Sequence, residues 1–273
     1  MRIARGISVT NTSKPISTAI VYDADAAAFF TAASITDNTQ KSAVNQLVLD
    51  LKSASIWTKM KALYPVVGGV ASAHAVNLKQ PGTYNLSFAT GWTHTSTGMT
   101  PNGATYADSF FNPRNNATLY NEHLSYYSRT QIATGINTDM GAFQNAVPNV
   151  YVNSLAILRN DGISVANINS NDFTRLTPSE TDGRGFFIIS RTASNSLKLY
   201  KNSAIKATNT TTTSLINPNY QITLGALNLD GGLAQYSNKQ CAFASIGDGL
   251  TDAEASSFYN AVQTYQTTLG RQV

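Results

Sequence analysis

From about residue 70 onward, short apolar runs alternate with clusters of Gly, Asn, Asp and Ser, and this pattern leaves few possible folds. Most runs contain β-branched or aromatic residues, which is typical of strands in an antiparallel sandwich. The runs occupy residues 150–152, 155–158, 186–189, 197–200, 220–224 and 242–246. We predict a mainly β fold, an antiparallel jelly-roll β-sandwich. Its strands should have apolar inner faces and hydroxyl- or amide-bearing outer faces.

Helical patterns lie on both sides of this region. Asp37 can cap a helix whose apolar stripe consists of Val44, Leu47, Val48 and Leu51. Residues 56–63 predict a second short helix. Near the C-terminus, Thr251 and Glu254 fit a capping box, so we predict a capping helix over residues 251–269 that packs against the sandwich.

These patterns divide the chain into three parts. Residues 1–34 have no strong period, and we interpret them as an arm that contacts neighbouring subunits. Residues 35–69 form a helical segment, and residues 70–273 form the sandwich with its C-terminal helix. A low charge density favours tight packing between subunits, because few ionic groups must be desolvated, and we expect a homo-oligomer.

The composition narrows the function classes. Charged residues make up only 12% of the chain, and the net charge is +4. No dense run of Lys and Arg is present, so we expect no nucleic-acid partner. Cys241 is the single cysteine and cannot form an intrachain disulfide. No early apolar run has signal-peptide or membrane-spanning length, so we expect cytosolic production without membrane insertion. The chain also has few charges, many Thr and Asn residues and Gly-rich turns, as exposed extracellular β-proteins have. Cytosolic production and this composition together favour a virion protein that is assembled in the host cytoplasm.

Residues suited to catalysis are scarce. The sequence has only three glutamates, Glu122, Glu180 and Glu254, whereas a glycoside hydrolase needs two carboxylates that face the scissile bond. The close pair Glu180 and Asp182 lies in a loop-like stretch, which we interpret as solvated. The three histidines lack metal-ligand spacing. We therefore predict a protein that is not an enzyme, with no catalytic residues, no metal and no cofactor.

Binding is better supported than catalysis. Aromatic faces stack on sugar rings, and carboxylate or amide groups accept and donate hydrogen bonds to the hydroxyls. The glycan-binding candidates are Trp92, Tyr106, Asp108 and Tyr127. The alternative for Tyr106 is that it is a strand residue of the core.

Several segments together resemble a known family. Residues 242–255 are similar to the ending of concanavalin A-like lectin/glucanase modules of the laminin-G-like type, in which a last strand leads through G-x-G-L-[ST]-x-x-E to a short helix. Residues 186–206 resemble the central hairpins of these modules, although Ser203 stands where the family often has Gly. Residues 102–108 are similar to an early strand after a Gly turn. Residues 56–65 resemble a version of the module found in virion structural proteins of tailed bacteriophages.

The resemblance covers residues 35–273 and implies a lectin-like jelly roll. The glucanase branch carries a Glu-x-Asp-x-Glu strand that is not present in this sequence, and no Asp/Asn cluster matches the lectin Ca²⁺ ligands. Our first hypothesis is a non-enzymatic phage virion structural protein, a head decoration, fibre or tail component, whose partners are other virion proteins and a host-surface glycan. The alternatives are a stand-alone glycan-binding or glycan-cleaving protein, and a bacterial surface adhesin.

Overall fold

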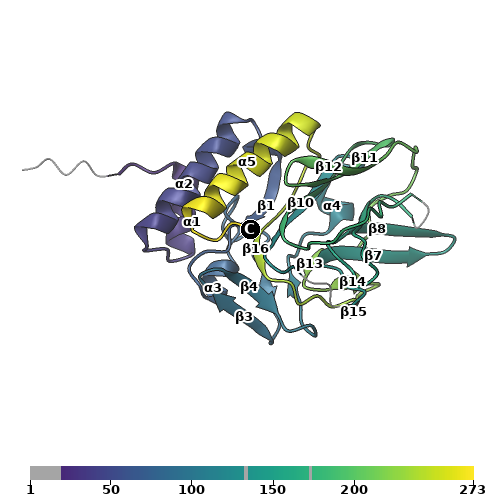
Figure 1. The fold of residues 1–273 in the computed structure, drawn as a ribbon, viewed down its shortest axis with the longest axis horizontal. Helices are drawn as coiled ribbons and strands as arrows, with labels where there is room; N and C mark the ends of the chain where they lie inside the picture. Colours follow the sequence, from purple (N-terminus) through teal and green to yellow (C-terminus); the bar gives the residue numbers. More distant parts are fainter. Residues whose placement is uncertain (1–19, 132–134, 172–173) are drawn as a thin grey trace, which may run out of the picture.

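The computed structural model describes residues 20–131, 135–171 and 174–273. Two sheets, in which antiparallel pairs predominate, pack face to face as a sandwich, and a layer of helices covers one of them (Figure 1). The fold class that the sequence predicts is therefore confirmed: a mainly β sandwich with helices on its N-terminal side and a helix at its C-terminus. Within these residues, no helix is both long enough and apolar enough to cross a membrane.

The first sheet is antiparallel throughout and is called sheet A. β1 (Met60–Tyr64) pairs with one edge of β16. The strand order is β12 (Ala204–Asn209), β11 (Ser196–Lys201), β10 (Gly185–Ala193), β6 (Glu122–Ser128), β16 (Cys241–Gly247), β4 (Gly98–Pro101), β3 (Trp92–Thr95).

The second sheet, sheet B, pairs β8 (Asn149–Ala156) with β7 and β9 (Val165–Ile168) with β8. Its only parallel pair among the described strands joins β14 to β7. The strand order along the remaining path is β15 (Gly232–Ala234), β14 (Leu227–Leu229), β7 (Met140–Ala146), β13 (Thr223–Leu224), β5 (Ala107–Asp108), β2 (Ser87–Phe88).

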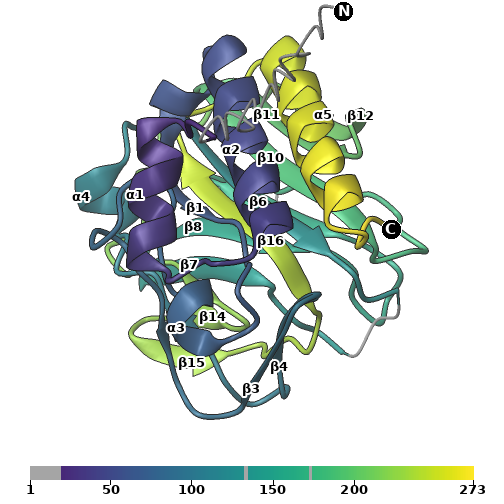
Figure 2. The same ribbon diagram turned by 90° about the vertical axis from the view of Figure 1, so that its left-hand side faces the viewer.

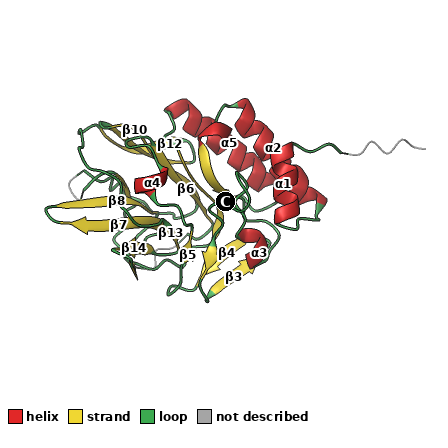
Figure 3. Cartoon of the chain, turned by 180° about the vertical axis from the view of Figure 1, so that it is seen from behind, coloured by secondary structure: helices red, strands yellow, loops and turns green. Residues whose placement is uncertain are grey.

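Sheet A is apolar on both faces, which differs from the prediction of a polar outer face. Neighbouring residues alternate between two cores, so that Phe186 faces the helices and Phe187 faces sheet B. The covering helices are α1 (Ala24–Ala32), α2 (Asn38–Ser53) and α5 (Asp252–Thr268), and Figure 2 shows α2 and α5 side by side over the sheet. Two single-turn helices, α3 (Ala71–His74) and α4 (Pro113–Asn116), lie elsewhere. The sandwich thus supplies two layers of a three-layer structure, and the helices supply the third, as seen from behind in Figure 3.

The N-terminal region departs from one expectation. Residues 56–63 were predicted to be helical, but a 3-10 turn, η1 (Trp57–Lys59), leads directly into β1. Pairing with β16 outweighs the helical pattern, because it lets Ala62 and Leu63 enter opposite cores. In addition, α1 lies within the proposed arm and buries Phe29 completely against the helical layer. Residues 1–19 lie outside the described part, so the proposed intersubunit contact stays a prediction there.

The turn into the last helix follows the predicted pattern. Thr251 and Glu254 form the capping box that was expected at the start of α5. A Cβ atom on Gly249 would collide with the backbone carbonyl oxygen of Arg191, and one on Gly247 would collide with that of Lys59. Both glycines are therefore required by close backbone approach, which explains the G-x-G pattern before the helix.

Candidate functional site

Tyr127 is not a surface residue, which corrects its selection as a glycan contact. It lies on β6, is fully buried, and stacks on Phe186 beneath the helical layer. Its hydroxyl donates to Oε1 of Gln263 on α5 at 3.3 Å. The helix α5 covers the face of sheet A that carries Tyr127.

Trp92, Tyr106 and Asp108 lie where the edges of the two sheets meet. Trp92 is half-buried on β3 and packs edge-on against Phe88 of β2. Its Nε1 donates to the backbone oxygen of Tyr106 at 3.0 Å. Burial raises the pKa of Asp108, which accepts a hydrogen bond from the backbone N–H of Phe110 at 2.7 Å. These contacts join β3 to sheet B, and a glycan role for the three residues stays a prediction.

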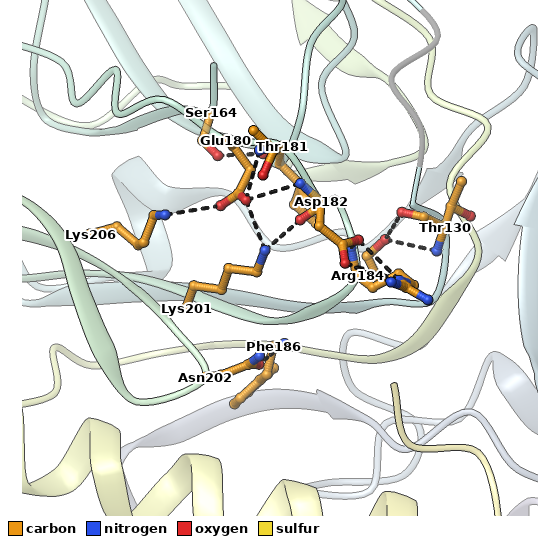
Figure 4. Close-up of polar contacts among 12 residues, drawn as sticks. Thr130, Ser164, Glu180, Thr181, Asp182, Arg184, Phe186, Lys201, Asn202 and Lys206 are labelled. Atoms are coloured by element: carbon orange, nitrogen blue, oxygen red, sulfur yellow. Dashed lines mark hydrogen bonds and ion pairs between the residues drawn. The ribbon is translucent and has the colours of Figure 1, made fainter. Parts of the chain in front are cut away.

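Glu180, the first of the two loop carboxylates, is buried rather than solvated (Figure 4). Its Oε1 accepts a hydrogen bond from Nζ of Lys201 at 2.9 Å, and Nζ of Lys206 lies 3.5 Å from Oε2. Burial alone would raise the pKa of Glu180, but the bonds from Lys201 and from backbone N–H groups outweigh it and leave the pKa below its usual value. Glu180 is thus held as a carboxylate and ties its loop to β11 and β12.

Asp182, the second loop carboxylate, is also paired. Nη2 of Arg184 donates to Oδ2 of Asp182 at 2.8 Å, and this hydrogen bond lowers the pKa of the carboxyl. Lys201 Nζ donates to the backbone oxygen of Asp182 (Figure 4). Two paired carboxylates with lowered pKa values are poorly suited to donate a proton.

The other two glutamates have structural surroundings as well. Glu122 lies between the sheets, accepts from Nδ2 of Asn153 at 2.6 Å, and burial raises its pKa to about 8. Glu254 belongs to the capping box and forms an ion pair with Lys59 at 2.6 Å. The glutamates therefore serve separate parts of the fold.

A cavity of about 220 Å³ lies on the outer face of sheet B, where β7, β8 and β9 run side by side. Its outward position follows from register: Leu155 and Ala166 enter the core between the sheets, whereas their neighbours Ser154 and Asn167 face the cavity. The apolar part of the wall consists of Phe143, Val152, Ala156, Val165 and Leu227. The polar part consists of Thr138, Ser154, Arg159, Asn167, Arg175 and Gln235. We call this cavity the sheet B pocket.

The arginines give the sheet B pocket its charge. Arg159 follows β8, its side chain is only 16% exposed, and Nη2 lies 3.1 Å from Oδ2 of Asp161 at the surface. Its Nε is buried and has no hydrogen-bond partner. Arg175 lies beyond β9 and lines the same pocket. Among the described residues that line the pocket, none is an aspartate or a glutamate.

Hydrogen bonds stiffen the rim of the sheet B pocket. Thr138 donates two hydrogen bonds to Gln235, each at 2.7 Å: its backbone N–H donates to the backbone oxygen, and its hydroxyl donates to Oε1. Gln235 itself has a positive φ of 51°. The adjacent Asp139 is fully buried and accepts from Ser237 Oγ at 2.6 Å. The rim is therefore preorganised by the core beneath it.

A second cavity of about 450 Å³ shares Arg159 with the sheet B pocket. Its wall includes Gln131, Asn160 and Glu180. Arg159 thus stands between two hollows, one over the strands and one over the loop that Glu180 anchors. The sequence analysis predicted neither hollow. The signal that could have indicated the outer face is the alternation of Ser154 and Asn167 with their apolar neighbours Leu155 and Ala166.

No protein-family model matches the sequence, and no curated protein matches it. Solved structures do match in three dimensions. A sialidase of Trypanosoma rangeli in complex with 2,3-difluorosialic acid aligns with a TM-score of 0.52 and 10% identity, over 80% of this chain and 38% of that one. The binding domain of botulinum neurotoxin serotype D aligns with a TM-score of 0.51 and 12% identity, over 76% of this chain and 52% of that one.

These similarities concern the fold. This chain spans less than two thirds of the length of either structure, and the identities are low. The matches agree with the β-sandwich fold that the sequence led us to expect.

Proposed function

We propose that this protein is a non-enzymatic glycan-binding module that is carried on a virion. The sheet B pocket is the observation that carries the glycan part of the proposal. It offers one aromatic side chain, Phe143, beside amide and hydroxyl groups, which is the combination that a sugar ring with its hydroxyls requires. The lectin-like sandwich supports the same function by analogy of fold.

The surroundings of the acidic residues support binding without cleavage. Glycoside hydrolysis requires two carboxyl groups about 5–10 Å apart across the bond. Among the residues that the structure describes, those that line the sheet B pocket include no carboxylate, and those that line the neighbouring hollow include one, Glu180, which is paired with Lys201. A glycan that binds here should therefore be released unchanged.

The glycan part can be tested with a glycan array and one aromatic substitution. We expect wild-type protein, displayed in many copies, to retain a subset of glycans, because avidity strengthens weak single sites. Phe143→Ala should abolish this retention, since it removes the aromatic wall. The matched control is Phe110→Ala, which changes an exposed phenylalanine outside the pocket. Retention of no glycan by the wild type, or equal retention by Phe143→Ala, would contradict the proposal.

The virion part rests on composition and on the resemblance to tailed-phage modules. Few charges and many Thr and Asn residues suit an outward-facing protein that packs into a homo-oligomer with other virion proteins. Mass spectrometry of purified virions should detect the protein in many copies per particle. Its absence from particles would refute this part and leave the glycan part standing.

A further inference from the structure

We propose that the sheet B pocket selects anionic saccharides, whose carboxylate or sulfate group binds at Arg159. This inference rests on the proposed glycan-binding function and adds the chemical class of the ligand. It depends on three features of the described residues. The Nε of Arg159 has no hydrogen-bond acceptor, the described residues of the pocket wall carry no negative charge, and Arg159 also lines the second hollow.

Other buried arginines of this protein show how guanidinium groups are normally satisfied here. Arg271 is 1% exposed and donates to the backbone oxygens of Pro65, Val66 and Ala242. Arg191 is equally buried and donates through Nε to the backbone oxygen of Ile168. The fold therefore supplies carbonyl acceptors where an arginine has a purely structural role.

Arg159 differs from these two arginines. Its Nε is buried at the pocket wall without an acceptor, and its charge partner is Asp161, whose side chain is 43% exposed. Exposed ion pairs contribute little, so Asp161 leaves most of the interaction energy of the guanidinium available. A carboxylate or a sulfate offers the planar or multiple acceptor oxygens that a guanidinium fork binds best.

The electrostatics of the pocket favour an anion over a neutral sugar. Arg159 and Arg175 both line the wall, and the described lining residues carry no negative charge. A neutral ligand would offer only neutral acceptors to the guanidinium of Arg159, whose side chain is 16% exposed, whereas an anion would form charge-assisted hydrogen bonds with it. Phe143 and the amide of Asn167 remain available for the apolar face and the hydroxyls of the same sugar.

The second hollow extends this preference to oligosaccharides. Glu180 lies in its wall, but Lys201 and Lys206 are 2.9 and 3.5 Å from its carboxylate oxygens and offset the negative charge. An anionic chain can therefore pass Arg159 without meeting an uncompensated carboxylate. We expect an acidic disaccharide or longer oligosaccharide to bind more tightly than the corresponding acidic monosaccharide.

The experiment compares acidic glycans with their neutral counterparts. Sialylated, uronic acid-containing and sulfated oligosaccharides are each paired with a form made by carboxyl reduction or desulfation, and binding to the full chain is followed by NMR titration. We expect the acidic member of at least one pair to bind about 10-fold or more tightly, as a hydrogen bond to a charged group implies. The reduced and desulfated arms show whether a carboxylate or a sulfate is recognised.

Single substitutions test whether Arg159 is responsible for the preference for acidic glycans. Arg159→Gln should lose about 10-fold or more in affinity for the acidic member and leave the neutral member within about 2-fold. Asp161→Asn should strengthen acidic binding by about 2- to 5-fold, since it removes the competing carboxylate. The charge-matched control is Lys41→Gln on α2, on the opposite side of the molecule, which should change neither affinity. Thermal unfolding of each variant confirms that it is folded.

Two results would overturn the inference. Equal binding of acidic and neutral members would refute the anion preference while the glycan-binding function stands. Acidic binding that survives Arg159→Gln in a folded protein would move the anion site elsewhere. If no glycan of either kind binds, the proposed function itself fails.

Discussion

Lys239 and Asp139 form a charged pair with no solvent exposure, and its removal should reveal how much this pair stabilises sheet B. Nζ of Lys239 lies 3.7 Å from Oδ1 of Asp139 and donates to Oδ1 of Asn137 at 2.9 Å. The other oxygen of Asp139 accepts from the backbone N–H of Ile157 at 2.7 Å. At an effective permittivity of about 20, two unit charges at this separation attract by about 4–5 kcal/mol.

Lys239→Met should therefore lower the free energy of unfolding by about 3–5 kcal/mol, because it leaves the buried charge of Asp139 without its counterion. For a chain of 273 residues, the entropy of unfolding is about 0.6 kcal/mol/K, so the midpoint should fall by about 5–9 °C. Urea unfolding followed by circular dichroism measures the free energy directly.

The matched control is Lys198→Met, which breaks an ion pair with Asp252 whose side chains are 27% and 56% exposed. This substitution should cost less than about 1 kcal/mol. A double-mutant cycle with Asp139→Asn then isolates the pair energy. A coupling near zero, or equal costs for the two lysine substitutions, would refute the reasoning.

Two further predictions concern pH and capping. Because the pKa of Glu122 is raised to about 8 in the folded state, its contribution to stability is complete below the unfolded value of 4.5 and is lost as the pH rises to about 8. Glu122→Gln should remove this slope of up to about 1.4 kcal/mol per pH unit in unfolding curves between pH 5 and 8, and an unchanged slope would contradict it. Thr251→Ala removes the capping hydroxyl of α5 and should cost about 1 kcal/mol in thermal unfolding, whereas Thr268→Ala, near the other end of the helix, should cost clearly less.

Local patterns in the sequence predicted the elements whose pairing partners are close in the chain. The runs at residues 186–189 and 197–200 became β10 and β11, joined by the expected hairpin, and the capping box set the start of α5. Residues 56–63 were assigned wrongly, because their partner β16 lies about 180 residues away and no local signal reports it.

The same limit explains the site. Strand periodicity separates the two faces of β6, but it cannot show that α5 covers the face of Tyr127. Arg159 and Arg175 lie on either side of β9, and only the register of β8 on β9 brings them to one pocket. Sequence reasoning therefore identified the β-sandwich scaffold but not the burial of Tyr127, and the glycan role of Trp92, Tyr106 and Asp108 stays a prediction.

The helical layer also decides where this scaffold tolerates change. Every residue of β6 is buried. A saturation library of this strand should therefore be depleted of polar and charged variants at consecutive positions, whereas a strand with one exposed face shows depletion at every second position. On β8, residues 152–156 are also buried, but the positions that border the sheet B pocket should accept polar variants, as Ser154 already shows. An engineer who wished to graft a new specificity would therefore diversify the outward residues of β7, β8 and β9 and leave the helix-backed sheet untouched.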